Sequence, residues 1–212
     1  MTYLELVNGV LARLREPEVG SIAQSTDHVV NMVKALVNDA KRHVELAHNW
    51  NATRMLWDFP TEVGVPSYIL EDTAGGCRLN VLTLDGWHVH QWDLKAVLHI
   101  SQGKPGLPFQ YAFDGTDNEG NISVRLGPIP DAVYKVQVLG HRVLADLKHD
   151  EDQVRIPAQP VLYYALALAA RERGEVGGQT ATELFAMAQQ YISDAIALDA
   201  NLSPTEKLAV TV

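Results

Sequence analysis

The chain has 212 residues, of which 47% are hydrophobic, and its formal net charge at pH 7 is -9. This composition excludes a disordered polymer and supplies apolar side chains for one ordinary core or two small ones. Unspecific binding to nucleic acid needs clustered Lys and Arg, so the acidic balance argues against it. The lone Cys77 excludes an intramolecular disulfide and a cysteine-based metal site. No run of eighteen apolar residues occurs and the first residues are unlike a signal peptide, so we expect folding in the cytosol.

The N-terminal part predicts two antiparallel helices. Thr2–Glu5 has the form of a capping box, and an apolar face follows it as far as Glu16-Pro17. A long helix is predicted from Asp27 to Trp50, with N-cap chemistry from Ser25-Thr26-Asp27. Its apolar residues form one stripe, which must pack against other helices, with Leu36 and Val37 in the middle. The opposite face is expected to be exposed and carries Asn31, Lys34, Asn38, Lys41, Arg42, Glu45 and His48.

After the long helix the period of the apolar residues changes to two, which is typical of strands. Gly-Gly, Asp-Gly and Asn-Glu-Gly turns separate the segments, and this pattern predicts an antiparallel meander whose last strand is central. The predicted strands are Arg54–Phe59, Ser67–Leu70, Arg78–Leu84, Trp87–Gln91, Leu94–Ser101, Phe109–Phe113, Asn121–Leu126 and Val133–Leu144.

Helical patterns return near the C-terminus. Pro157 and Pro160 suit the first turn of a helix that runs to Arg173 and stops at Gly174, and its many Ala residues would allow close packing on the long helix. A second capping box at Thr180–Glu183 begins the last helix. The expected fold class is α+β. A helical bundle from both termini (residues 1–50 and 149–200) carries an inserted antiparallel β domain (51–148), and a C-terminal tail follows (201–212).

Two groups of residues are candidate metal ligands. His88 and His90 would project from one face of a strand, where His99 or Asp85 could approach them, but no third ligand stands at a diagnostic spacing. The loop with Asp114, Asp117 and Glu119 resembles a calcium loop only superficially, because the glycine and the final glutamate of an EF-hand are misplaced. We therefore expect no metal site and no cofactor.

Signals for catalysis are also missing. The chain has no Gly-x-Ser-x-Gly elbow, no histidine near Cys77 in the sequence and no Gly-rich phosphate loop before a helix. We expect no catalytic residue and no enzyme activity. Trp87 and Trp92 flank predicted turns and are the tryptophans expected to be most exposed, with core packing and interface contact as equal interpretations.

The order of elements and several stretches resemble a known family. The stretches are 5–17 (ELVNGVLARLREP), 37–45 (VNDAKRHVE) with Trp50 after it, 106–113 (GLPFQYAF) and 127–136 (GPIPDAVYKV). They look like the head-to-tail adaptors of tailed bacteriophages, with tail tubular protein A and tail accessory factor of short-tailed phages as the nearest relatives.

The resemblance implies a structural virion protein of the neck or tail, assembled in the host cytoplasm. It would form a homo-oligomeric ring, usually of twelve subunits, beneath the portal protein. The ring would present a platform to the next tail component, such as a nozzle or tail tube protein, and DNA would pass through its channel without specific binding. We expect subunit or tail contacts at Trp87, Trp92, Phe109 and Tyr111, and portal docking at Leu202, Leu208, Val210 and Val212.

Two alternatives from other classes remain open at this point. One is a β-rich ligand-binding module on a helical base, with Trp87, Trp92 and Tyr111 as a platform for a sugar or peptide. The other is a metal-dependent hydrolase at the His88-x-His90 strand.

Overall fold

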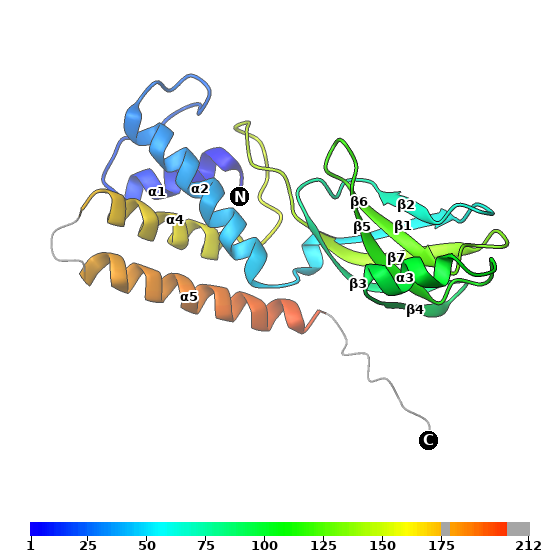
Figure 1. Cartoon of the computed structure of the whole chain (residues 1–212). Helices are drawn as coiled ribbons and strands as arrows, with labels where there is room; N and C mark the ends of the chain where they lie inside the picture. The colour runs from blue at the N-terminus through cyan, green and yellow to red at the C-terminus, as the bar shows by residue number, and fades with distance from the viewer. Residues whose placement is uncertain (175–178, 203–212) are drawn as a thin grey trace. The chain divides into compact units, whose positions relative to one another are not determined.

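A computed structural model describes residues 1–174 and 179–202, without the side chains of Gln179 and Thr180. The chain divides into two compact units. The helical unit contains Met1–Ala52 and the described residues from Ala145 onward, and the β unit contains Thr53–Leu144. The expected α+β class is confirmed, because helices from both ends of the chain pack together and a mostly antiparallel sheet is inserted between them in the sequence (Figure 1).

Local capping fixes where the first two helices begin. In α1 (Tyr3–Arg13) the Thr2 hydroxyl accepts a hydrogen bond from the Glu5 amide at 3.2 Å, and the Glu5 carboxylate accepts one from the Thr2 amide at 2.8 Å, so the predicted capping box is confirmed. In α2 (His28–Ala47) Asp27 caps the helix by accepting from the Val29 amide at 2.7 Å. This helix ends three residues before the expected Trp50.

The two C-terminal helices complete the bundle. Helix α4 (Ala158–Glu172) packs against α1, α2 and α5 (Gln179–Ala200), as Figure 1 shows. Its alanines at 165, 167, 169 and 170 are all buried, which confirms the predicted close approach to α2. Gly174 has a φ of 60°, a conformation that glycine adopts without strain, and it follows the C-terminal end of α4 as predicted. The capping box expected at Thr180 lies outside the described side chains.

Trp50 lies in the core of the helical unit. Its side chain is completely buried, and its indole N–H donates to the carbonyl of Val44 at 2.8 Å. Apolar residues from α1, α2, α4 and α5 join it in one cluster, whereas Leu36, expected in the middle of the apolar stripe, is only partly buried at its margin. None of the described helices is long and apolar enough to span a membrane.

One face of α2 differs from the prediction. Lys41 and Glu45, expected on the exposed face, are 1% and 5% exposed. The Lys41 ammonium lies 3.0 Å from the Glu45 carboxylate, one helical turn away. A buried charge is tolerated only when it is paired, so periodicity of charged residues alone gave the wrong face for these two.

A short 3-10 helix, η1 (Asn51–Thr53), precedes a seven-stranded sheet in the order β1-β7-β3-β4-β5-β6-β2. All neighbouring strands are antiparallel except β4 and β5, which are parallel. The expectation of a purely antiparallel domain was therefore wrong at this one pair. Strand β7 has a partner on each side, as expected for an interior strand. The strands are β1 (Arg54–Pro60), β2 (Ser67–Leu70), β3 (Cys77–Leu84), β4 (Trp87–Gln91), β5 (Gln110–Thr116), β6 (Ile122–Gly127) and β7 (Lys135–Arg142).

The two outermost strands of this order approach each other through side chains. The indole N–H of Trp57 in β1 donates to the carbonyl of Glu71, just after β2, at 2.8 Å. The rings of Phe59 and Tyr68 lie 5.4 Å apart. The sheet is therefore strongly curled around its own apolar core, which contains Trp57, Leu70, Leu82, Leu84, Val89, Tyr111, Val124, Leu126, Val136 and Val138.

The segment Leu94–Ser101, expected to be a strand, is helix α3. Asp93 caps it by accepting from the Lys95 amide at 2.8 Å. Buried Val97 packs against β6, where a Cβ on Gly127 would come within 2.9 Å of the Val97 side chain. This helix connects β4 to β5, and a helical connection of this kind is what allows the two strands to be parallel.

Candidate interaction surfaces

Three of the four aromatic residues expected at an interface are exposed: Trp87 begins β4, Trp92 follows its last residue and Phe109 precedes β5. Trp87 is 76% exposed, Trp92 53% and Phe109 50%. Backbone hydrogen bonds place Phe109 beside β4 and Trp92 beside β5. The His90 amide donates to the carbonyl of Phe109 at 3.1 Å, and the Trp92 amide donates to the carbonyl of Tyr111 at 2.8 Å. Large exposed rings of this kind are typical anchors of protein contacts.

A hollow of about 540 Å³ adjoins this aromatic group. Its walls are residues 91–94 from the end of β4 to the start of α3, together with Ala112 and Phe113 of β5. Phe113 is itself 38% exposed and was not among the residues expected at an interface. The hollow is open to solvent, which suits contact with a partner protein better than enclosure of a small molecule.

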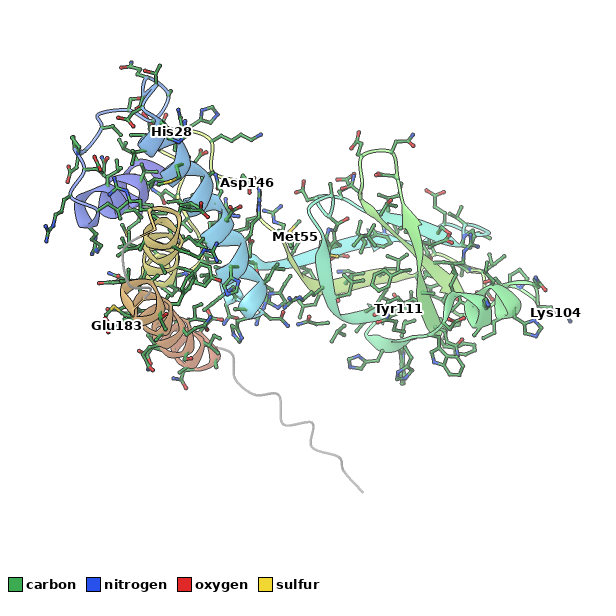
Figure 2. The ribbon with its side chains drawn as sticks, turned by 60° about the vertical axis from the view of Figure 1, so that its left-hand side comes forward. His28, Met55, Lys104, Tyr111, Asp146 and Glu183 are labelled. Carbon is green, nitrogen blue, oxygen red and sulfur yellow. The ribbon has the colours of Figure 1, made fainter. Side chains whose placement is uncertain are left out.

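Tyr111 does not share this exposure. It is 4% exposed and lies within the β unit, where Figure 2 labels it among the strands. Its ring meets Phe113 edge-on at 6.3 Å, and burial raises the pKa of its hydroxyl. Tyr111 is therefore not presented to solvent beside Trp87 and Trp92, and the platform of the ligand-binding alternative loses its third ring.

Helix α3, which was expected to be a strand, presents a second exposed surface. The exposed ridge of α3 carries Lys95, Leu98 and His99, and Lys104 lies beyond its end (Figure 2). Leu98 is 38% exposed, and Leu107 in the following loop is 51% exposed. The cue that could have identified it is Asp93, an N-cap residue ahead of leucine and valine at helical spacing.

The histidines of β4 do not converge with other ligands. His88 and His90 are both exposed, and the described residues contain no group of three or more His, Cys, Asp or Glu side chains that could hold a metal ion. The hydrolase alternative therefore has no assembled metal site within these residues.

The acidic residues Asp114, at the end of β5, and Asp117, in the turn to β6, both make local hydrogen bonds. Asp114 accepts hydrogen bonds from Arg125 at 2.9 Å and Ser67 at 2.7 Å. Burial opposes ionisation of Asp114, but these two partners outweigh it and lower its pKa. Asp117 accepts from the amides of Glu119 and Asn121, which shapes the turn. These contacts explain Asp114 and Asp117 as parts of the local structure of β5 and its turn to β6.

Cys77 is a half-buried residue at the start of β3. Burial raises the pKa of its thiol, which disfavours the nucleophilic thiolate. The side chain therefore has the properties of a small packing residue.

The residues expected to dock on the portal are described only in part. Leu202 follows α5 and is 74% exposed, whereas Leu208, Val210 and Val212 lie outside the described residues. The exposed side of α5 carries two further large apolar residues, Met187 at 45% and Leu198 at 71%.

Comparison with known proteins gives one family. The sequence model described as SU10 adaptor protein matches residues 1–207, which is nearly the whole chain. No curated protein matches.

Proposed function

The chain belongs to the SU10 adaptor protein family, a family of structural proteins that join phage heads to tails, and from this membership we propose that it forms a ring between the portal and the tail. The family confirms the resemblance seen in the sequence. In the proposal, twelve copies close a ring beneath the portal protein, present a platform to the next tail component and extend the channel for DNA. The protein is thus a part of the virion neck or tail that assembles in the host cytoplasm, and its role needs no catalytic residue.

The observation that carries the proposal is the family match over residues 1–207, since it covers both units. The net negative charge of the chain supports a role as a channel for DNA. A chain with net charge -9 does not attract the phosphate backbone in bulk, so DNA can pass without being held.

Exposed aromatic residues support a role in assembly. Trp87, Trp92 and Phe109 present large apolar surfaces, which favour contacts with a neighbouring subunit or with the next tail component. An isolated monomer gains nothing from such exposure, whereas a ring that binds proteins above and below it uses several surfaces at once.

The direct test is the mass and image of the assembled particle. Concentrated full-length protein, with and without purified portal rings, is analysed by negative-stain electron microscopy and by mass measurement. We expect closed rings with one copy number that sit on the portal. Monomers that remain separate in both samples would refute the proposed ring.

We propose further that residues 201–212 dock on the portal, because Leu202 is exposed and the sequence beyond it carries more apolar residues. Binding would bury apolar surface that solvent otherwise contacts. Deleting residues 201–212 should leave the melting temperature unchanged and weaken co-sedimentation with portal rings. Equal co-sedimentation of the truncated and full-length proteins would remove this docking role.

A further inference from the structure

The exposed face of α5 has an unusual composition for a helix of 22 residues. Between Gln179 and Ala200 the sequence contains no Lys, Arg or His. One exposed stripe at helical spacing carries Glu183, Met187, Gln190, Asp194 and Leu198. Among the described residues, Glu183 and Asp194 have no ion-pair partner, although Gln190 donates a hydrogen bond to Asp194 at 2.9 Å. The stripe is acidic and apolar at once.

The surface around α3 has the opposite character. From Leu94 to Phe113 the sequence has no Asp or Glu, in a chain with 26 acidic residues. Lys95, His99 and Lys104 are exposed there beside Leu98 and Leu107, and the nearest acidic residue in the sequence, Asp93, caps the helix. We call this set the α3 surface.

The two lysines of the α3 surface differ from other cations of the β unit. Arg125, Lys135 and Arg142 each pair with an aspartate of the same unit. Neither lysine of the α3 surface has such a partner within the part of the chain that the structure describes. Their charges are therefore available to a binding partner.

From this complementarity we propose that the exposed stripe of α5 in one copy docks on the α3 surface of a second copy. Unlike charges then face each other, Glu183 and Asp194 opposite Lys95 and Lys104. The apolar residues of the two surfaces lose contact with water together. Each copy carries one stripe and one α3 surface, so the contact is head-to-tail and generates a ring when the rotation closes. The proposal rests on the ring proposed above and assigns one of its subunit contacts.

The size of the stripe sets a second expectation. From Glu183 to Leu198 it is about 22 Å long at 1.5 Å rise per residue, and such a narrow strip covers less than the roughly 800 Å² per partner typical of a stable interface. Exposed charges are screened over about 10 Å at 0.1 M salt. The contact should therefore weaken as ionic strength rises and should persist mainly in the closed ring.

Charge reversal in two separate variants provides the test. K95E/K104E places acidic groups opposite the acidic stripe, and E183K/D194K places basic groups opposite the basic surface. Because like charges repel when they face each other in an interface, each variant alone should lose about ten-fold or more of its assembled fraction. All four positions are exposed, so the melting temperature of each monomer should stay close to that of the unchanged chain.

Mixing the two variants should restore assembly. In a mixture each copy contributes one unchanged and one reversed surface, and every contact in an alternating ring is then complementary. Particle mass and image measure the rescue. A photo-cross-linker at Leu98, in a mixture of isotopically labelled and unlabelled copies, identifies by mass spectrometry whether α5 of another copy is its partner.

The possible results distinguish a failure of the proposed contact from a failure of the proposed ring. Rings that form normally in both single variants, or cross-links from Leu98 to any segment other than α5 of another copy, would overturn the contact and leave the ring intact. Failure of the unchanged chain to assemble under any condition would refute the ring and the contact together. Loss of assembly in each variant, with rescue in the mixture, supports the proposal.

Discussion

The helical unit and the β unit use their apolar side chains in different ways. The core of the helical unit contains more than twice as many buried apolar residues as the core of the β unit. Most of the exposed large apolar residues in the described chain belong to the β unit instead. The difference indicates that apolar surface mainly stabilises the fold in the helical unit, whereas in the β unit much of it remains available to partners.

The largest expected effect tests the interior of the helical unit. Replacing Lys41 by Met leaves the Glu45 carboxylate buried without the ammonium group 3.0 Å away, so K41M should lower the free energy of unfolding by about 3–5 kcal/mol. Urea denaturation measures the change. The matched control, K41M/E45L, removes both charges and should recover much of the loss. Equal losses in the two variants would contradict a strong dependence on the pair.

The next effect tests how tightly the β unit packs where β1, β3 and β7 meet. A Cβ on Gly140 would lie 2.7 Å from the carbonyl oxygen of Arg78 and 3.1 Å from the Trp57 ring. Gly140→Ala should therefore cost about 1–3 kcal/mol through overpacking. Gly106→Ala is the matched control, because nothing lies within 4 Å of its added Cβ. If thermal melting shows the same shift for both, the close approach at Gly140 is wrong.

A smaller effect concerns pH and Asp114 at the end of β5. The pKa of Asp114 is lowered in the folded chain, so its contribution to stability is present above its ordinary value of 3.8 and is lost as the pH falls through the lowered pKa. Asp114→Asn should cost less than about 1 kcal/mol at pH 7, as expected for a pair near the surface. The difference between the two proteins in urea should shrink as the solution is acidified below pH 3.8. A difference that grows on acidification would mean that the pKa is raised.

The smallest change in stability should come from the exposed aromatic group. Trp87→Ser should alter the free energy of unfolding by no more than about 0.5 kcal/mol, because the side chain is 76% exposed. Val89→Ala, two residues along the same strand but buried, should cost more. We expect Trp87→Ser to reduce binding to a neighbouring subunit or to the next tail component, measured by co-sedimentation. Unchanged binding would leave the ring to be joined through other surfaces.

The helical unit was the easier part to predict from sequence. Helical spacing and caps such as Thr2 and Asp27 act locally, so the sequence contains the information that determines where α1 and α2 begin. The errors came from tertiary context. Lys41 and Glu45 look like solvent-facing residues, and only the packing of the folded unit shows that their charges are paired in its interior.

In the β unit most strands were predicted, but α3 was not. Leu94–Ser101 has only eight residues, and at that length a short apolar run fits a strand as well as a helix. This one error also concealed the parallel pairing of β4 with β5. The burial of Tyr111 could not be predicted either, because alternation assigns residues to a face of a strand and does not show which end of that face is covered.

Because β1 pairs with β7, the two ends of the inserted β unit lie next to each other. Arg54, almost the first residue of the unit, stands opposite His141, near its last, so the chain enters and leaves through neighbouring strands. An inserted unit with adjacent ends, here called a cassette, can be exchanged by recombination at two points without changing the fold of the rest of the polypeptide. The same adjacency means that a few residues could bridge the gap if the cassette were removed, leaving the helices contiguous. Phage chains that share this bundle could therefore acquire new surfaces by replacing the cassette alone.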